Sequence, residues 1–174
     1  MTDLLAIDPG NVESAWALID ADTCWPAYVG KAPNVRVRDL LAGSATIVAI
    51  EMIASYGMPV GAEVFETVLE IGRFVEIAPW ARLVYRRDIK LHHCGSMRAN
   101  DANVAQALVD RFAPGAPNRG KGTKAAPGWF YGFSADIWQA YALAVFAADT
   151  LNDTPGRSPA ACPEQMELPL EGAK

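Results

Sequence analysis

A short apolar run that ends in an acid and a turn opens the sequence and constrains the fold more than any other feature. Residues 4–8 read Leu-Leu-Ala-Ile-Asp, and Pro9-Gly10 follows at once. An apolar run of this length before a turn is typical of a buried strand. Residues 45–51 form a second such run, rich in β-branched side chains, which also ends in an acid. The two runs predict a central sheet as the core of the protein.

The remaining elements predict a single α/β domain over residues 1–151. We expect further strands at 15–20, 25–31 and 82–85, and helices at 37–42, 61–77, 88–93 and 101–112. A last helix begins at Ser134 or Asp136 and reaches about residue 151. Asp101 is the expected N-cap of its helix, and Val64, Val68, Ile71 and Val75 are expected on one face of theirs. Three strands followed by alternating helices and strands indicate a mixed sheet.

Two segments lack these patterns. Residues 113–132 are rich in Gly, Pro and Lys and predict a long loop, a kind of segment that is usually functional or disordered. Residues 152–174 are dominated by Pro, Gly, Ser and Ala and predict a flexible tail.

The charge of the chain is distributed unevenly. The net charge is −5, which argues against a nucleic-acid partner. Residues 82–124, however, carry nine Lys or Arg against three Asp or Glu, whereas the rest carries six against seventeen. A phosphate backbone is bound by local positive surface, so this segment is a candidate DNA-binding region. The alternative is a solvated basic face.

Three carboxylates stand where elements begin or end. Asp8 closes the first strand, Glu51 closes the fourth, and Asp136 opens the last helix. An acid at the carboxyl end of a buried strand faces the crevice where α/β sheets bind ligands. Carboxylates gathered there repel one another, and oxygen ligands of this kind suit Mg²⁺ or Mn²⁺. The alternative is that each acid only caps a turn or a helix, and spacing alone does not decide between the two.

Four segments resemble motifs of the RuvC-type Holliday-junction resolvases. Residues 5–10 (Leu-Ala-Ile-Asp-Pro-Gly) are similar to the opening strand motif, and residues 48–51 (Val-Ala-Ile-Glu) to the second acidic motif. Residues 87–90 (Arg-Asp-Ile-Lys), followed by Gly95-Ser96, resemble the basic motif after the fifth strand. Asp136, followed by residues 139–144, resembles the final acidic helix. Residues 50–61, and 122–124 with 127–128, resemble the phage and prophage proteins of this kind.

The resemblance implies a ribonuclease H-like fold, with a mixed five-stranded sheet flanked by helices. It also implies an endonuclease, dependent on Mg²⁺ or Mn²⁺, that hydrolyses phosphodiesters in Holliday junctions or other branched DNA. Asp8, Glu51 and Asp136 would be the metal ligands, with Lys90 near the scissile phosphate to stabilise developing charge. It further implies a homodimer that places two sites across a junction.

The sequence departs from the family's pattern in its last motif. The family has a second Asp three residues after the first, and here that position is Gln139, a poor metal ligand. Asp101 is an alternative ligand, although helix capping is its competing role. Asn100 stands where related proteins often have Lys, and Arg98 is the nearby cation. Because guanidinium has no free electron pair, Arg98 does not act as a base.

Basic and aromatic side chains make up the expected DNA surface. The candidate phosphate contacts are Arg86, Arg87, Arg98, Lys121 and Lys124. Tyr56 is a candidate for stacking on splayed bases at a branch point. Trp129, Phe130 and Tyr131 either do the same or pack in the core.

The tail contains one short motif. Residues 165–170 (Gln-Met-Glu-Leu-Pro-Leu) resemble the peptide with which proteins bind the bacterial sliding clamp. In that interpretation Leu168 and Leu170 are apolar anchors and Gln165 forms a hydrogen bond at the rim of the pocket. The alternative is that the leucines fold back on the domain or have no role.

Three functions therefore remain open. The first is a structure-selective DNA endonuclease, the second an RNA-processing or general nuclease on the same fold, and the third a catalytically weak DNA-binding protein associated with the clamp. No apolar run is long enough to span a bilayer, and Met-Thr-Asp does not begin a signal peptide. We therefore expect a cytoplasmic protein of a bacterial cell, with phage or prophage origin as a possibility left open.

Overall fold

The computed structural model describes residues 2–43, 47–55, 57 and 59–151. Tyr56 and the clamp-like motif with Gln165, Leu168 and Leu170 lie outside the described residues.

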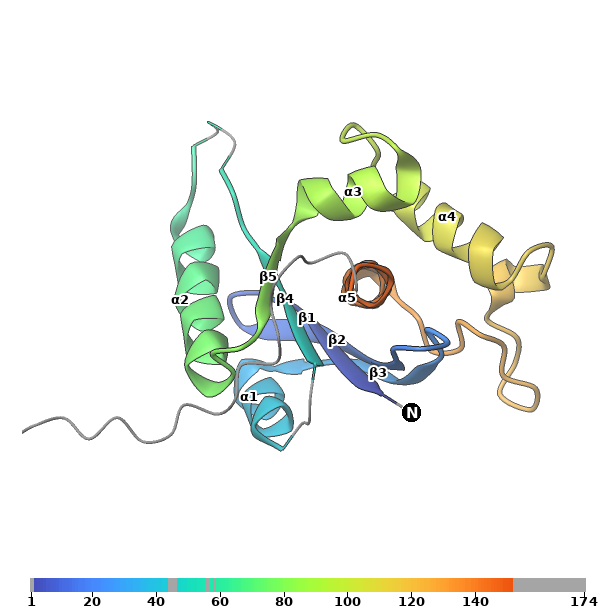
Figure 1. Ribbon diagram of the computed structural model, residues 1–174, viewed down its shortest axis with the longest axis horizontal. Coiled ribbons are helices and arrows are strands. Elements are labelled where there is room, and N and C mark those ends of the chain that lie inside the picture. Colours follow the sequence, from blue (N-terminus) through green and yellow to red (C-terminus); the bar gives the residue numbers. More distant parts are fainter. Residues whose placement is uncertain (1, 44–46, 56, 58, 152–174) are drawn as a thin grey trace, which may run out of the picture.

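Five strands form one mixed sheet (Figure 1). They are β1 (Asp3–Asp8), β2 (Glu13–Asp20), β3 (Pro26–Pro33), β4 (Ile47–Met52) and β5 (Arg82–Tyr85), in the order β3-β2-β1-β4-β5. The first three strands pair antiparallel, and β1, β4 and β5 pair parallel. The fold class expected from the sequence is confirmed.

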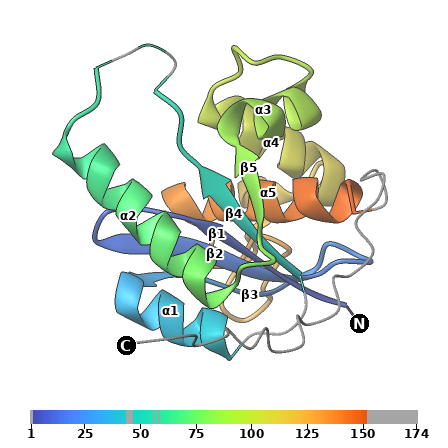
Figure 2. The same cartoon turned by 60° about the vertical axis from the view of Figure 1, so that its left-hand side comes forward.

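Helices cover both faces of the sheet. Helices α1 (Asn34–Ala42) and α2 (Ala62–Ile77) lie on one face, and α5 (Ala135–Asp149) lies on the other, across β1 and β2 (Figures 1 and 2). Helices α3 (Arg86–Cys94) and α4 (Asp101–Phe112) pack on α5. Among the described residues, no helix combines the length and the apolar character that a membrane crossing requires.

Alternation along the strands divides the core into two halves. On β1, Leu4 and Ala6 pack with α5, whereas Leu5 and Ile7 pack with α1 and α2. On β4, Ala49 faces α5 while Val48 and Ile50 face the other way. Because successive side chains of a strand point to opposite faces, this pattern also fixes the direction of the acids that end the two strands.

The buried face of α2 differs from the expected one. Val68 is exposed and Val64 and Val75 are only half-buried, and the described buried residues of α2 are Thr67, Glu70, Ile71 and Phe74. Glu70 forms ion pairs with Arg38 of α1 and with Arg73. These two partners offset the cost of burying the Glu70 carboxylate. Helix α2 therefore packs Glu70 against α1, and not the predicted valines.

Two helix starts also differ from the prediction. Asn100, not Asp101, is the N-cap of α4: its side chain accepts a hydrogen bond from the Asn103 amide, and the Asn103 side chain accepts one from the Asn100 amide. This reciprocal capping leaves the Asp101 carboxylate free for another partner. Helix α3 begins at Arg86, two residues earlier than expected.

Candidate active site

Asp8 is the last residue of β1 and Glu51 the last but one of the neighbouring parallel strand β4, and both lie on the same face of the sheet. The register pairs Ile7 with Ile50, so the two acids are the next residues along β1 and β4. Asp8 lies two residues after Ala6, and Glu51 two residues after Ala49, so each acid points to the same face of the sheet as that alanine. Both alanines face α5. Strand pairing therefore brings these two carboxylates together beneath one helix, as their positions at strand ends predicted.

The turn after Asp8 is held by a buried polar network. The Gly10 amide donates to Ser14 Oγ (3.2 Å), Ser14 Oγ donates to Asn34 Oδ1 (2.7 Å), and Asn34 Nδ2 donates to the Gly10 carbonyl (2.9 Å). A Cβ at Gly10 would lie 2.3 Å from the Glu13 carbonyl oxygen, which only glycine avoids. The network therefore fixes the direction in which the chain leaves Asp8.

Asp136 reaches the same place from the first turn of α5. Across the sheet, Asp8 is opposite Ala15 and Ala15 is opposite Lys31, so Lys31 shares the face of Asp8. Lys31 Nζ donates to Asp136 Oδ2 at 2.6 Å. Between Asp8 and Lys31 stands only the small side chain of Ala15. A cavity of about 320 Å³ lies here, and Asp8, Ala15, Lys31 and Asp136 are among its lining residues.

Arg86 links the carboxylates of Glu51 and Asp101. Its Nη1 donates to Glu51 Oε2 (3.1 Å) and its Nη2 to Asp101 Oδ1 (2.6 Å). Burial alone would lower the pKa of Arg86, but the charges of Glu51 and Asp101 raise it. Arg86 was predicted as a phosphate contact, and in the structure its guanidinium instead bridges two carboxylates.

The electrostatics of the cluster are those of crowded, partly buried acids. Burial first, and the charge of Glu51 second, raise the pKa of Asp8 to about 8, and Arg86 offsets only part of this shift. Asp136 and Asp101 contribute in the same direction, so the other three carboxylates all raise the pKa of Asp8. Burial also raises the pKa of Glu51, against the opposing charges of Arg86 and, more weakly, Lys90.

A second cavity lies on the other side of Asp136. It has a volume of about 230 Å³, and its polar lining comes from Asp101, Arg119, Asp136 and Gln139. The Oε1 atom of Gln139 is buried and has no hydrogen-bond partner among the residues that the structure describes. A buried acceptor without a partner is costly, so Gln139 is suited to receive a ligand or a water from this cavity.

The chemistry of the donors fits a divalent cation. Asp8, Glu51, Asp136 and Asp101 offer only oxygen ligands, which Mg²⁺ and Mn²⁺ prefer. Burial first and repulsion from the neighbouring acids second raise the pKa of Asp8, and a bound cation would relieve the repulsion. Within the described part of the chain, however, no three His, Cys, Asp or Glu side chains are grouped closely enough to hold a metal ion. Asp136 faces Lys31, and Glu51 and Asp101 face Arg86, so these cations neutralise the acids in the arrangement seen here.

The remaining predicted DNA contacts are spread over α3, α4 and the loop before α5. Lys90 lies close enough to Glu51 to influence its pKa. Arg87 pairs with Asp88 and lies over the Tyr85 ring. Arg98, Lys121 and Lys124 have no ion pair among the described residues.

The loop before α5 is more ordered than its composition predicted. It contains the 3-10 turn η1 (Pro117–Gly120) and a bridge between Gly122 and Pro127. Phe130 is fully buried, so its predicted alternative role in base stacking is wrong. Trp129 stacks on Phe112 and donates to Tyr141 Oη, whereas Tyr131 remains exposed.

Comparison with known proteins supports this architecture. No family model and no curated protein sequence matches the chain. Among solved structures, RuvC of Thermus thermophilus is similar with a TM-score of 0.63 and 15% identity, over 87% of this chain and 96% of that one. The chain has the RuvC fold. T. thermophilus RuvC in complex with a Holliday junction substrate also matches, with a TM-score of 0.63 and 12% identity, over 88% and 96% of the two chains.

Reasoning from the sequence missed two cations beside the acids of this RuvC-like fold. Lys31 lies on the third strand, whose sequence carries no sign of the strand register that places it near Asp136. Arg119 contributed to the basic segment but was not singled out, and it lines the cavity beside Asp136. Its only sequence signal is its place in a long Gly- and Pro-rich loop.

Proposed function

We propose that this chain is a metal-dependent endonuclease that cleaves Holliday junctions or other branched DNA by phosphodiester hydrolysis. The observation that supports the proposal is that the charges of Glu51, near a strand end, and Asp136, at a helix start, both act on Asp8 at the end of β1, on a sheet with the RuvC fold. The similar structure that contains a Holliday junction substrate supports the same substrate class.

Each residue has a proposed role. Asp8, Glu51 and Asp136 hold Mg²⁺ or Mn²⁺, with Asp101 or Gln139 as a further ligand. Bound there, the ion supplies an activated water and stabilises the departing oxygen. Lys90, one turn into α3, stabilises negative charge on the scissile phosphate. Arg87, Arg98, Lys121 and Lys124 contact flanking phosphates, and Tyr56 stacks on a base at the branch point.

The proposal is tested by cleavage of matched synthetic substrates. Four-way, flap, linear duplex and RNA–DNA hybrid substrates of the same sequence are incubated with Mg²⁺, with Mn²⁺ and with chelator. We expect cleavage of the four-way or flap DNA, abolished by chelator and by Glu51→Gln, which retains junction binding because the basic surface is intact. Preferential cleavage of the hybrid would favour the general or RNA-processing nuclease instead.

Gln139 favours one alternative, a catalytically weak DNA-binding protein tethered to a sliding clamp. Because Gln139 replaces a carboxylate of the family's pattern, the site has less negative charge with which to attract a metal ion. The tail motif of Gln165, Leu168 and Leu170 would raise the local concentration of the protein at replicated DNA.

This alternative has its own test. A peptide of residues 163–174 is titrated against a bacterial clamp, next to a peptide in which Gln165, Leu168 and Leu170 are changed to Ala. Binding by the first peptide alone supports the tether, whereas equal binding by the two, or binding by neither, excludes it. Metal-dependent junction cleavage at ordinary enzymatic rates would exclude the catalytically weak protein, whatever the tail does.

A further inference from the structure

We propose that Arg119 binds a backbone phosphate of the DNA strand that enters the site, on the side of Asp136 that faces Asp101. The inference rests on the proposed function and adds a residue to it. Arg119 lines the 230 Å³ cavity with Asp101, Asp136 and Gln139, so its side chain borders the space beside the proposed metal ligands.

The guanidinium of Arg119 is held in place without being neutralised. Its Cζ lies 5.1 Å from the centre of the Trp138 ring, and Trp138 is itself buried against Phe130 and Phe133. No ion pair of Arg119 occurs among the residues that the structure describes. Arg86 and Lys31, by contrast, are already paired with the acids of the site. Arg119 therefore keeps its donors available for an incoming anion.

The backbone supports the same conclusion. Arg119 has a φ of +53°, in the left-handed region that a side chain other than Gly, Asn or Asp rarely adopts. Asn118 and Gly120 on either side have φ of +51° and +73°. A Cβ at Gly120 would lie 2.5 Å from the Ala113 Cβ, so close packing fixes the segment. An arginine at a position that glycine would occupy without strain indicates that the side chain itself is needed.

This strain provides a variant that separates function from folding. Arg119→Gly removes the guanidinium and relieves the backbone, so we expect the melting temperature to be unchanged or higher. Binding to a four-way DNA junction, measured without cleavage in chelator and in Ca²⁺, should weaken roughly tenfold or more. The slope of log affinity against log salt should fall by about 0.9, the change for one lost phosphate contact. Arg119→Lys should keep most of the slope but not all of the affinity, because an ammonium lacks the planar stack on Trp138.

Single methylphosphonate substitutions identify the contact. Each phosphate flanking the cleavage point is replaced in turn by a neutral methylphosphonate, and binding is measured with wild-type and Arg119→Gly proteins. At one position the substitution should weaken wild-type binding and leave Arg119→Gly unaffected. Arg36→Ala is the control, because Arg36 lies on α1 on the opposite face of the sheet and is highly exposed.

The outcomes distinguish this inference from the proposed function. If wild-type protein binds and cuts branched DNA but Arg119→Gly has the same affinity and salt slope, Arg119 does not contact phosphate and only this inference is wrong. The same holds if every methylphosphonate weakens both proteins equally. If wild-type protein neither binds nor cuts branched DNA, the proposed function fails and this inference fails with it.

Discussion

Asp8 is the residue on which the charges of the site act most strongly. Besides its burial, the charges of Glu51, Asp136 and Asp101 raise its pKa, and the charge of Arg86 opposes them. Asp8→Asn replaces a crowded carboxylate with a neutral side chain of the same shape. Without metal, we therefore expect a melting temperature at neutral pH no lower than that of wild type.

Added metal should make the wild-type protein more stable than Asp8→Asn. Mn²⁺ should raise the melting temperature of the wild-type protein and raise that of Asp8→Asn less, because a ligand is missing. Junction cleavage should fall at least about a hundredfold, while junction binding remains. An equal gain in melting temperature for the two proteins would contradict the assignment of Asp8 as a ligand.

Lys31 competes with a cation for Asp136. Its Nζ lies 2.6 Å from the Asp136 carboxylate, so an incoming metal ion must displace it. Lys31→Met keeps most of the apolar stem and removes the charge, and we expect it to bind Mn²⁺ severalfold more tightly in calorimetric titration. Lys31→Arg, which keeps the charge, is the matched control. Weaker Mn²⁺ binding by Lys31→Met would show instead that Lys31 orients Asp136 for the metal.

The acids of the candidate site were predictable from the sequence, whereas their partners were not. Asp8 and Glu51 stand at the ends of runs that must be strands, and alternation fixes their faces once the strands pair in parallel. The pairing of Arg86 with Glu51 and Asp101 depends on where β5 and α4 lie in space. No local pattern encodes where these elements lie, so the sequence predicts a phosphate contact for Arg86 and does not predict its pairing with the two acids.

Among the elements, α3, α4 and α5 are joined by a single carboxylate. Asp149 near the end of α5 accepts hydrogen bonds from Arg111 of α4 (2.6 and 2.9 Å) and pairs with His92 of α3 (2.8 Å). Burial alone would raise the pKa of Asp149, but these partners hold it below its ordinary value of 3.8. The stability that Asp149 provides is therefore present above pH 3.8 and is lost as pH falls through the lower folded value.

Asp149→Asn tests whether this carboxylate holds the three helices together. We expect a lower melting temperature than wild type at neutral pH, with the difference shrinking in acid as the wild-type carboxylate takes up a proton. Circular dichroism melts over a pH series provide the measurement. Glu76→Gln, on the exposed surface of α2, is the control. A difference that stays constant down to the lowest pH would show that the charge of Asp149 is not what stabilises the helices.

The loop before α5 was predicted only as a loop, because its order depends on distant contacts. Phe130 and Phe133 anchor it to Trp138 and Tyr141 of α5, and the bridge from Gly122 to Pro127 closes its tip. Composition shows the glycines but not which of them pack closely. The positions of the strands and of most helices along the chain, by contrast, followed from hydrophobic patterns that act locally.

The tip of this loop carries two cations, Lys121 and Lys124, that form no ion pair within the described part of the chain. The double change to Ala should weaken junction binding and reduce the slope of log affinity against log salt by about 1 to 2, because fewer counterions are released. The fold should be unaffected, since Lys124 is exposed and Lys121 only half-buried. Fluorescence anisotropy over a salt series measures the slope, and an unchanged slope would remove this tip from the DNA surface.

At the scale of the whole molecule, positive charge is concentrated in one segment of the chain. The basic segment, residues 82–124, spans β5, α3, α4 and the start of the loop, whereas α1 and α2 lie across the sheet from α5 (Figures 1 and 2). The net charge of −5 therefore coexists with a segment whose own net charge is positive. We expect DNA to approach the α3–α4 side, which leaves α2 available for another partner.

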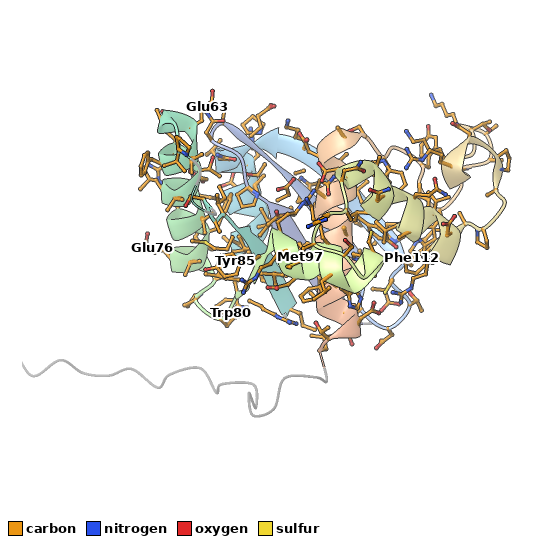
Figure 3. All side chains as sticks on the ribbon, turned by 90° about the horizontal axis from the view of Figure 1, so that it is seen from above. Glu63, Glu76, Trp80, Tyr85, Met97 and Phe112 are labelled. Atoms are coloured by element: carbon orange, nitrogen blue, oxygen red, sulfur yellow. The ribbon has the colours of Figure 1, made fainter. Side chains whose placement is uncertain are left out.

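We expect the outer surface of α2 to contact a second copy of the chain. Phe65, Val68 and Leu69 follow helical spacing and are 64, 40 and 58% exposed, on the helix whose two ends Glu63 and Glu76 mark in Figure 3. Resolving a four-way junction needs cuts in two strands, and each chain has one candidate site. A twofold dimer through the same surface on both copies would supply the second site.

Changing Phe65 and Leu69 to Glu tests this arrangement. In sedimentation, we expect wild-type protein to be a dimer and the double variant a monomer with an unchanged melting temperature, because neither side chain belongs to the core. Coordinated cleavage of both strands of a junction should be lost, while binding of metal persists, since α2 is not among the residues that line the site. Met97→Glu is the control, because Met97 is 64% exposed in the turn between α3 and α4. A monomeric wild type, or a double variant that still dimerises, would exclude α2 as the contact between copies.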